Sequence, residues 1–229
     1  MIVVVANRWD TGAKALASRW ASHHARILTC QDFSIGGWRQ TLNSGGARTA
    51  IVQGMAVPQD QIAGVLTRSS CVFEHELSHI IPGDREYVAA EMTAFLWFWL
   101  SSLHCRVINR PTPAGLSGPY RQEYWTSLAA HAGLPVEPVR RRAIVAVSEM
   151  EETLPPAATV IVVGDRVFGE TDPILQKHAR NLAGFASVEL LAVRFSGAER
   201  GARFLSADPV PDLDDERVAT AVLERFTCN

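Results

Sequence analysis

The alternation of short apolar runs with helical stretches over the first 110 residues is the feature that most constrains this fold. Residues 2–6 are continuously apolar and β-branched, which is typical of a buried parallel strand. Residues 11–23 have helical spacing, and residues 26–29 predict a second strand. Further strands are predicted at 49–53, at 64–67 or alternatively 71–73, and at 106–109. The pattern predicts an α/β domain with an open, mostly parallel sheet and flanking helices.

A strongly apolar helix is predicted over residues 85–103. Pro82-Gly83 interrupts the chain before it, and Asp84 suits the N-cap position. Apolar side chains, including Trp97 and Trp99, point to nearly all sides of this helix. A helix without a polar face is either buried between layers or covered by another chain. We therefore weigh a core helix against an interface with a second copy or a protein partner.

The second part of the chain predicts a smaller α+β domain. Its elements are a helix at 121–132 closed by Gly133, an apolar run at 143–147, a loop at 149–158, a hairpin of 159–163 with 166–169, a helix at 174–182, strands at 188–195 and 203–205, and a closing helix at 215–226. The expected domains are residues 1–118 and 119–229.

Composition argues against several classes of protein. The chain has 229 residues, 47% of them apolar and 20% charged, an ordinary globular balance. Its net charge of −2 gives no basic surface for nucleic acid, so no nucleic-acid partner is expected. The most apolar run, 92–100, is too short to cross a bilayer, so no membrane span is expected.

The N-terminal segment and the cysteines both favour a cytoplasmic protein. The segment MIVVVANRW has no basic n-region and no cleavage site, so we expect no signal peptide. The four cysteines are widely spaced and form no CxxC pair. Such spacing favours reduced thiols over a disulfide framework.

Two stretches resemble segments of the ATP-grasp ligases. The first begins at DREYVAAE (residues 84–91) and continues through VINRP (107–111) and LSGP (116–119) to AGLPV (132–136). It is similar to the junction between the N-terminal domain of such a ligase and its nucleotide-binding half. The second, VVGDRVF at 162–168, resembles a strand pair of the family usually written VVGDRVFA, and FLSADPVP at 204–211 matches the outline of FLEVNPNP. The resemblance implies a pre-ATP-grasp-like first domain and a second domain like the C-terminal part of an ATP-grasp fold.

The departures from the family concern its chemistry. Residues 139–160 replace a much longer family segment and contain neither the lysines nor the glycine-rich flap that hold ATP phosphates. The metal-holding pattern of the family falls on Ser206 and Asp208, and serine is a poor substitute for a carboxylate on Mg²⁺. Glu189 stands where the family often has a carboxylate, and Arg166 is placed to contact phosphate. Arg166, Glu189 and Asp208 are therefore the candidate cofactor-binding residues, and no catalytic residue is assigned.

The resemblance and the departures together predict a shortened, degenerate ATP-grasp-like protein. We expect a non-catalytic or partner-dependent subunit, a scaffold, or a module that binds a peptide or substrate. A homodimer or a protein partner through residues 85–103 is expected, and no cofactor is expected, with ATP and Mg²⁺ as the alternative. If the chain is active, the resemblance implies ATP-dependent carboxylate–amine ligation.

A competing motif lies at residues 75–79, which match H-E-x-x-H. On a helix, His75 and His79 would bind Zn²⁺ and Glu76 would act as general base, which predicts a zinc-dependent hydrolase. The strand-like residues before the motif and Pro82-Gly83 after it oppose a long helix, and no third ligand stands at the usual offsets. A structural homo-oligomer built on the aromatic helix is the third hypothesis.

Overall fold

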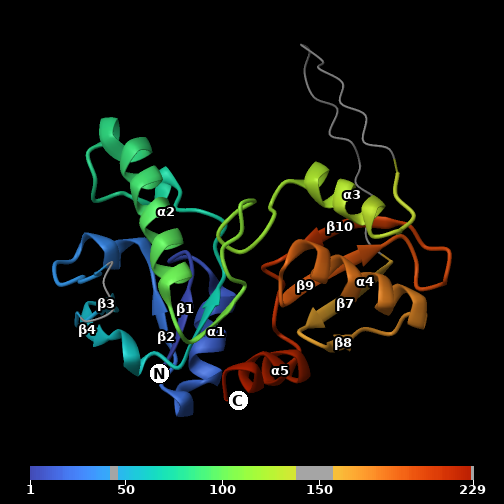
Figure 1. Ribbon diagram of the computed structural model, residues 1–229, viewed down its shortest axis with the longest axis horizontal. Coiled ribbons are helices and arrows are strands. Elements are labelled where there is room, and N and C mark those ends of the chain that lie inside the picture. The colour runs from blue at the N-terminus through green and yellow to red at the C-terminus, as the bar shows by residue number, and fades with distance from the viewer. Residues whose placement is uncertain (42–45, 138–156, 228–229) are drawn as a thin grey trace. The chain divides into compact units, whose positions relative to one another are not determined.

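The structure, a computed structural model, describes residues 1–41, 46–137 and 157–227 (Figure 1). The chain forms two compact units, one of Met1–Gly118 with Asp212–Asn229 and one of Pro119–Pro211. The predicted domain division stays a prediction, and the closing helix packs with the first unit. The apolar run at 143–147 and the predicted loop up to residue 156 lie outside the described residues.

Four parallel strands form the sheet of the first unit, in the order β2-β1-β5-β6. Their bounds are Ile2–Val5 (β1), Arg26–Leu28 (β2), Gly64–Thr67 (β5) and Arg106–Ile108 (β6). All of β1 is buried, as its β-branched sequence predicts for a central parallel strand. The predicted open parallel sheet is thus confirmed, and residues 71–73 are not a strand.

The strand predicted at 49–53 lies outside this sheet. It is β3 (Thr49–Val52), and it pairs antiparallel with β4 (Met55–Pro58) in a two-stranded hairpin. Gln53 and Gly54 between them have φ of 52° and 74°. Two left-handed residues make the tight turn that matches the twist of a hairpin, and such a turn permits only antiparallel pairing. The sequence prediction missed this turn because Gln53 is an unusual residue for it.

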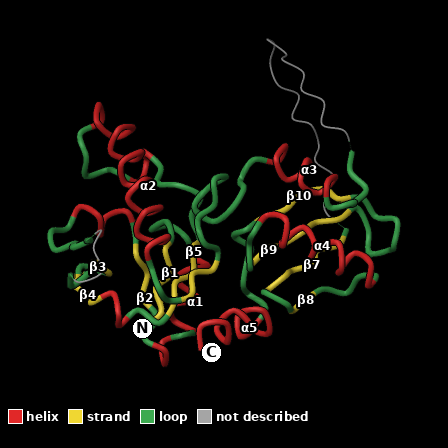
Figure 2. The backbone as a smooth tube through the Cα atoms, in the orientation of Figure 1, coloured by secondary structure: helices red, strands yellow, loops and turns green. Residues whose placement is uncertain are grey.

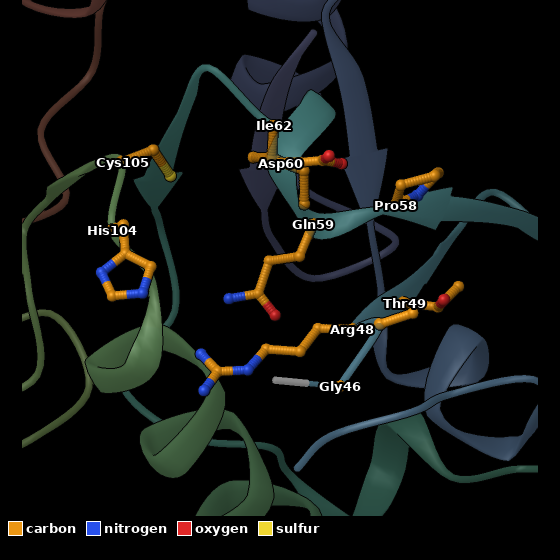
Figure 3. A pocket seen from close by; sticks show the side chains of 10 residues that line it. Gly46, Arg48, Thr49, Pro58, Gln59, Asp60, Ile62, His104 and Cys105 are labelled. Carbon is orange, nitrogen blue, oxygen red and sulfur yellow. The ribbon is translucent and has the colours of Figure 1, made fainter. Parts of the chain in front are cut away.

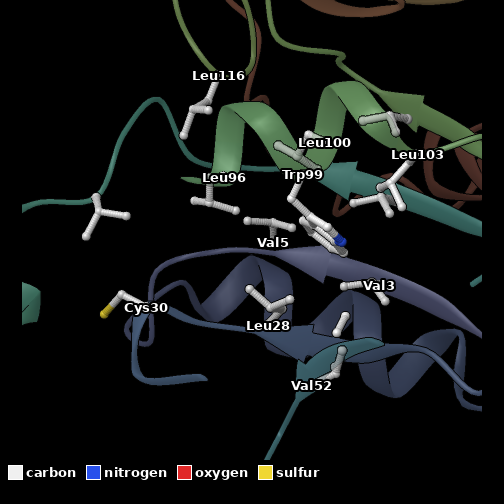
Figure 4. Packing of buried hydrophobic residues seen from close by; sticks show 14 of the residues in the cluster. Val3, Val5, Leu28, Cys30, Val52, Leu96, Trp99, Leu100, Leu103 and Leu116 are labelled. Atoms are coloured by element: carbon white, nitrogen blue, oxygen red, sulfur yellow. The ribbon is translucent and has the colours of Figure 1, made fainter. Parts of the chain in front are cut away.

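The described residues of the first unit form three α-helices: α1 (Thr11–Arg19), α2 (Arg85–Ser102) and α5 (Glu216–Thr227). Figure 4 shows Leu96, Trp99 and Leu100 of α2 in the cluster of buried residues that also holds Val3 and Val5 of β1. These five side chains are at most 3% exposed. No helix in the described part of the chain is long and apolar enough to span a membrane.

An antiparallel sheet and two helices form the second unit. The sheet order is β10-β9-β7-β8, and the bounds are Ala158–Val163 (β7), Arg166–Phe168 (β8), Leu190–Phe195 (β9), Phe204–Asp208 (β10), Gln122–His131 (α3) and Pro173–Ala186 (α4). Side chains of α3 and α4 pack on one face of the sheet, in a cluster with alternate residues of β7 and β9. Figure 2 shows the backbone of the two helices beside this sheet. The predicted hairpin around Gly164 is present, and Gly133 has the positive φ of 80° expected after a helix.

Candidate functional site

The three candidate cofactor-binding residues, Arg166, Glu189 and Asp208, lie at one end of the antiparallel sheet. Arg166 opens β8 opposite Val163, the last residue of β7. Glu189 directly precedes β9, and its carbonyl accepts a hydrogen bond from the N–H of Gly164 at 2.7 Å. Asp208 ends β10. Because neighbouring strands run antiparallel, these strand ends meet at the same edge of the sheet.

Arg194 restricts what Asp208 can bind. Ser206 pairs with Arg194 and Asp208 pairs with Ala192, so the three polar side chains share one face of the sheet. That face lies opposite α3 and α4, which pack on the Val193 side. A guanidinium nitrogen of Arg194 lies 3.6 Å from Oδ2 of Asp208, and Oδ1 accepts a hydrogen bond from the N–H of Val210 at 2.9 Å. Both carboxylate oxygens of Asp208 therefore already have partners.

Several side chains at the carboxyl edge of the parallel sheet pack against one another. Open α/β sheets usually bind ligands at this edge. Here Asp10 caps α1 through the N–H of Ala13, and its carboxylate pairs with Arg68 at 2.9 Å. A cavity beside Cys30 measures about 10 Å³, room for a single water. Burial, with the nearby charge of Glu76, raises the pKa of the Cys30 thiol to about 11, so Cys30 is not a nucleophile at neutral pH.

The H-E-x-x-H segment does not form an α-helix. Its first residues belong to a short 3-10 helix, Glu74–Glu76, and turns follow. The ring of His75 is stacked on those of Trp9 and Phe73, with centroid distances of 5.6 and 5.4 Å. His75 is therefore exposed to solvent and is held by its contacts with these two aromatic rings.

The other two motif residues also have separate partners. Glu76 is 3% exposed and accepts a hydrogen bond from the N–H of Phe73, so its carboxylate caps the short helix. Nε2 of His79 lies 2.8 Å from the hydroxyl of Ser34. Among the described residues, no group of three or more His, Cys, Asp or Glu side chains is placed to hold a metal. The zinc alternative lacks the helical geometry that it requires.

A groove of about 460 Å³ runs along the N-terminal half of α2. Small residues of the helix form its floor, and Phe73 and Trp97 form walls that are 43% and 39% exposed. Glu74 and Glu86 also line it. The helix is thus neither fully buried nor polar on its outer side, and the groove presents an apolar channel with two carboxylates.

Comparison with solved structures decides the fold. No protein-family model and no curated protein matches the sequence. The macrocyclase MdnC of Microcystis aeruginosa MRC, solved with the precursor peptide MdnA, is 11% identical at a TM-score of 0.72, with all of both chains covered. The macrocyclase MdnB of the same organism is 14% identical at 0.69, covering 100% of this chain and 99% of its own.

A third solved structure carries the family name. It is a RiPP-associated ATP-grasp ligase of Chryseobacterium gregarium, solved with ADP and a leader and core peptide. It is 8% identical at a TM-score of 0.65, covering 99% of this chain and 96% of its own. The chain has an ATP-grasp-like fold. The resemblance inferred from the two sequence stretches is therefore correct at the level of the fold.

The ATP-grasp-like fold implies Mg·ATP, and Ser206 and Asp208 at the sheet edge fit the metal of that group poorly. Mg²⁺ takes oxygen ligands, preferably carboxylates together with phosphate oxygens. Ser206 offers no charge, and Asp208 is shared between Arg194 and the N–H of Val210. The positive charge of Arg194 beside Asp208 opposes the binding of a second cation at the same place. No pattern in the sequence marked Arg194, because only the pairing of β9 with β10 shows that it lies beside Asp208.

Proposed function

We propose that this protein is a peptide-binding ATP-grasp-like module without ligase activity of its own. The observation that carries the proposal is the apolar groove on α2, bordered by Glu74 and Glu86. Solved proteins with this fold are described in complex with precursor, leader or core peptides, which supports a peptide as the partner.

The chemistry of the groove selects a class of peptide. Ala90 and Ala94 are exposed and leave space above the helix backbone, and the indole of Trp97 gives a flat apolar wall. An apolar side chain that enters this channel removes apolar surface on both sides from water. The carboxylates of Glu74 and Glu86 attract a Lys or Arg on the same segment. The expected ligand is an amphipathic peptide with apolar and basic residues.

The residues at the sheet edge of the second unit disfavour ATP-dependent ligation. Acyl-phosphate formation requires a metal that neutralises the phosphates of ATP. Ser206 and the Arg194–Asp208 contact disfavour that metal. In this account the protein binds the peptide, and a separate enzyme acts on it.

The test uses tryptophan fluorescence in a Trp9→Phe background, because Trp9 is 50% exposed and would otherwise contribute to the signal. In that background Trp97, at 39%, is the most exposed tryptophan, and Trp20, Trp99 and Trp125 are at most 1% exposed. An amphipathic peptide built from Leu and Lys is titrated into the protein, and the matched peptide has Glu in place of Lys. We expect the emission maximum to move to shorter wavelength with the Lys peptide, because its apolar side chains exclude water from the indole. We expect no shift with the Glu peptide, because its charges repel Glu74 and Glu86.

Two helix variants control this experiment. Ala94→Arg fills the groove and is expected to weaken binding of the Lys peptide about tenfold or more. Ala130→Arg places the same side chain on an exposed position of α3, and binding is expected to stay unchanged. Equal affinity of both peptides, or no effect of Ala94→Arg, would contradict the proposal.

A homodimer through α2 is the second candidate. Tyr87, Trp97 and Phe98 of this helix are 69%, 39% and 40% exposed, and such clusters mark contact surfaces. Sedimentation velocity separates the two candidates. A dimer that Ala94→Arg converts to a monomer would favour self-association, whereas a monomer that binds the Lys peptide supports the peptide-binding module.

A further inference from the structure

Four flat side chains are stacked on the surface of the first unit, in the order Arg8, Trp9, His75 and Phe73. The guanidinium carbon of Arg8 lies 4.6 Å from the ring centroid of Trp9, and His75 is stacked between two rings. Among the described residues no ring contact joins Trp9 directly to Phe73, so His75 separates them. The three rings are exposed, which is typical of a contact surface. We call these four side chains the aromatic ladder.

The aromatic ladder continues the α2 groove. Phe73 belongs to both, because it is a wall of the groove and the last ring of the ladder. Trp9 follows β1 and Phe73 follows β5, and these strands are parallel neighbours, so the ladder lies beyond the carboxyl edge of the sheet. A peptide segment that leaves the groove past Phe73 therefore meets an exposed row of rings that leads to Arg8.

The two ends of this surface carry opposite charges. The groove end has the carboxylates of Glu74 and Glu86. At the other end Arg8 is half-buried, and within the described residues no carboxylate pairs with it. Asp10, two positions further along the chain, is already paired with Arg68. An unpaired guanidinium beside apolar rings favours an acidic group on a ligand.

We propose that the aromatic ladder binds a second part of the peptide that the α2 groove takes, and that this part carries an Asp or Glu for Arg8. The inference rests on the proposed function of the groove. From Phe73 to Arg8 the ladder measures at most about 16 Å, which about five residues of extended chain span. The expected peptide thus has a basic and an acidic residue about five positions apart, with apolar residues between them that cover the rings.

Isothermal titration calorimetry with extended peptides tests the ladder separately from the groove. The parent is the Leu and Lys peptide, acetylated and amidated so that its ends are uncharged. Four Ala residues and a final Asp, Asn or Lys are added to the N-terminus in one set and to the C-terminus in another. In one set we expect the Asp peptide to bind about twofold to fivefold more tightly than the Asn peptide, and the Lys peptide to bind more weakly. The set that responds gives the direction of the peptide.

The outcomes separate this inference from the proposed function. If the parent peptide binds and Asp adds nothing over Asn in either set, the inference is wrong and the groove proposal stands. If no peptide binds, both are wrong. A dimer that Arg8→Glu converts to a monomer would show that a second copy covers the ladder, which would also overturn the inference.

Exchange of the two charges identifies the contact. Arg8→Glu is expected to reverse the order, so that the Lys peptide binds more tightly than the Asp peptide. Arg48→Gln is the control for Arg8→Gln, because Arg48 is also half-buried but lines a separate hollow of about 1020 Å³ before β5 and β6 (Figure 3). The preference for Asp over Asn is expected to disappear in Arg8→Gln and to persist in Arg48→Gln. An unchanged order in Arg8→Glu would contradict the assignment.

Trp9 is a positioning residue in this site, because its ring lies beneath the guanidinium of Arg8. Trp9→Ala removes the ring and is expected to reduce the preference for Asp over Asn, whereas Trp9→Phe keeps a ring and is expected to retain most of it. A role of Trp9 in folding alone would lower the melting temperature of Trp9→Ala and leave the preference for Asp unchanged, which would contradict the positioning role.

Discussion

Asp10 joins the first helix to the parallel sheet through two interactions. It caps α1 at the N–H of Ala13 and pairs with Arg68, whose side chain is 7% exposed. Removing one partner of such a pair leaves a desolvated charge, which costs more than the pair itself contributes.

Substitution of Asp10 separates the cap from the charge. Asp10→Ala is expected to lower the free energy of unfolding by about 3 kcal/mol, measured by urea denaturation. Asp10→Asn keeps a capping oxygen and is expected to lose less. A loss below about 1 kcal/mol for Asp10→Ala would show that the pair with Arg68 does not stabilise the fold.

Helix α5 depends on the absence of a side chain at Gly64. A Cβ at this position of β5 would collide with the ring of Phe226, which also packs edge-on against Trp20 at a centroid distance of 6.4 Å. Gly64 and Phe226 lie far apart in the sequence, so no local pattern could predict this contact. The closing helix itself was predicted from its own spacing.

Gly64→Ala is therefore expected to lower the free energy of unfolding by about 1–3 kcal/mol, because it overpacks the contact with α5. The same substitution in a Phe226→Ala background is expected to have a smaller effect, since the colliding ring is gone. Gly184→Ala in α4 is the matched control, because nothing lies within 4 Å of its added Cβ. A similar loss in both backgrounds would contradict the proposed packing.

Local chemistry explains which elements the sequence predicted. The β-branched run of β1, the hairpin glycine Gly164 and the helix-ending Gly133 act through their own backbone preferences, and all three predictions are confirmed. The placement of β3 was wrong because the turn at Gln53 decides its partner. The expectation that residues 75–79 do not lie on a long helix is confirmed, and aromatic stacking and capping hold them in a short 3-10 helix and turns.

At the scale of the whole molecule, the ATP-grasp-like fold was readable from motif order, whereas the groups around the sites were not. Arg194 reaches Asp208 only through the register of β9 with β10. Such groups belong to separate elements, so spacing along the chain carries no signal for them. The fold therefore does not determine the chemistry of the sites that it carries.

Isothermal titration calorimetry with Mg·ATP measures whether the protein has kept a nucleotide site. We expect no saturable binding, with a dissociation constant above about 1 mM, because Ser206 and Arg194 disfavour a metal beside Asp208. Micromolar binding of Mg·ATP that Glu189→Gln or Asp208→Asn abolishes would contradict it and would make the chain a nucleotide-dependent ligase candidate.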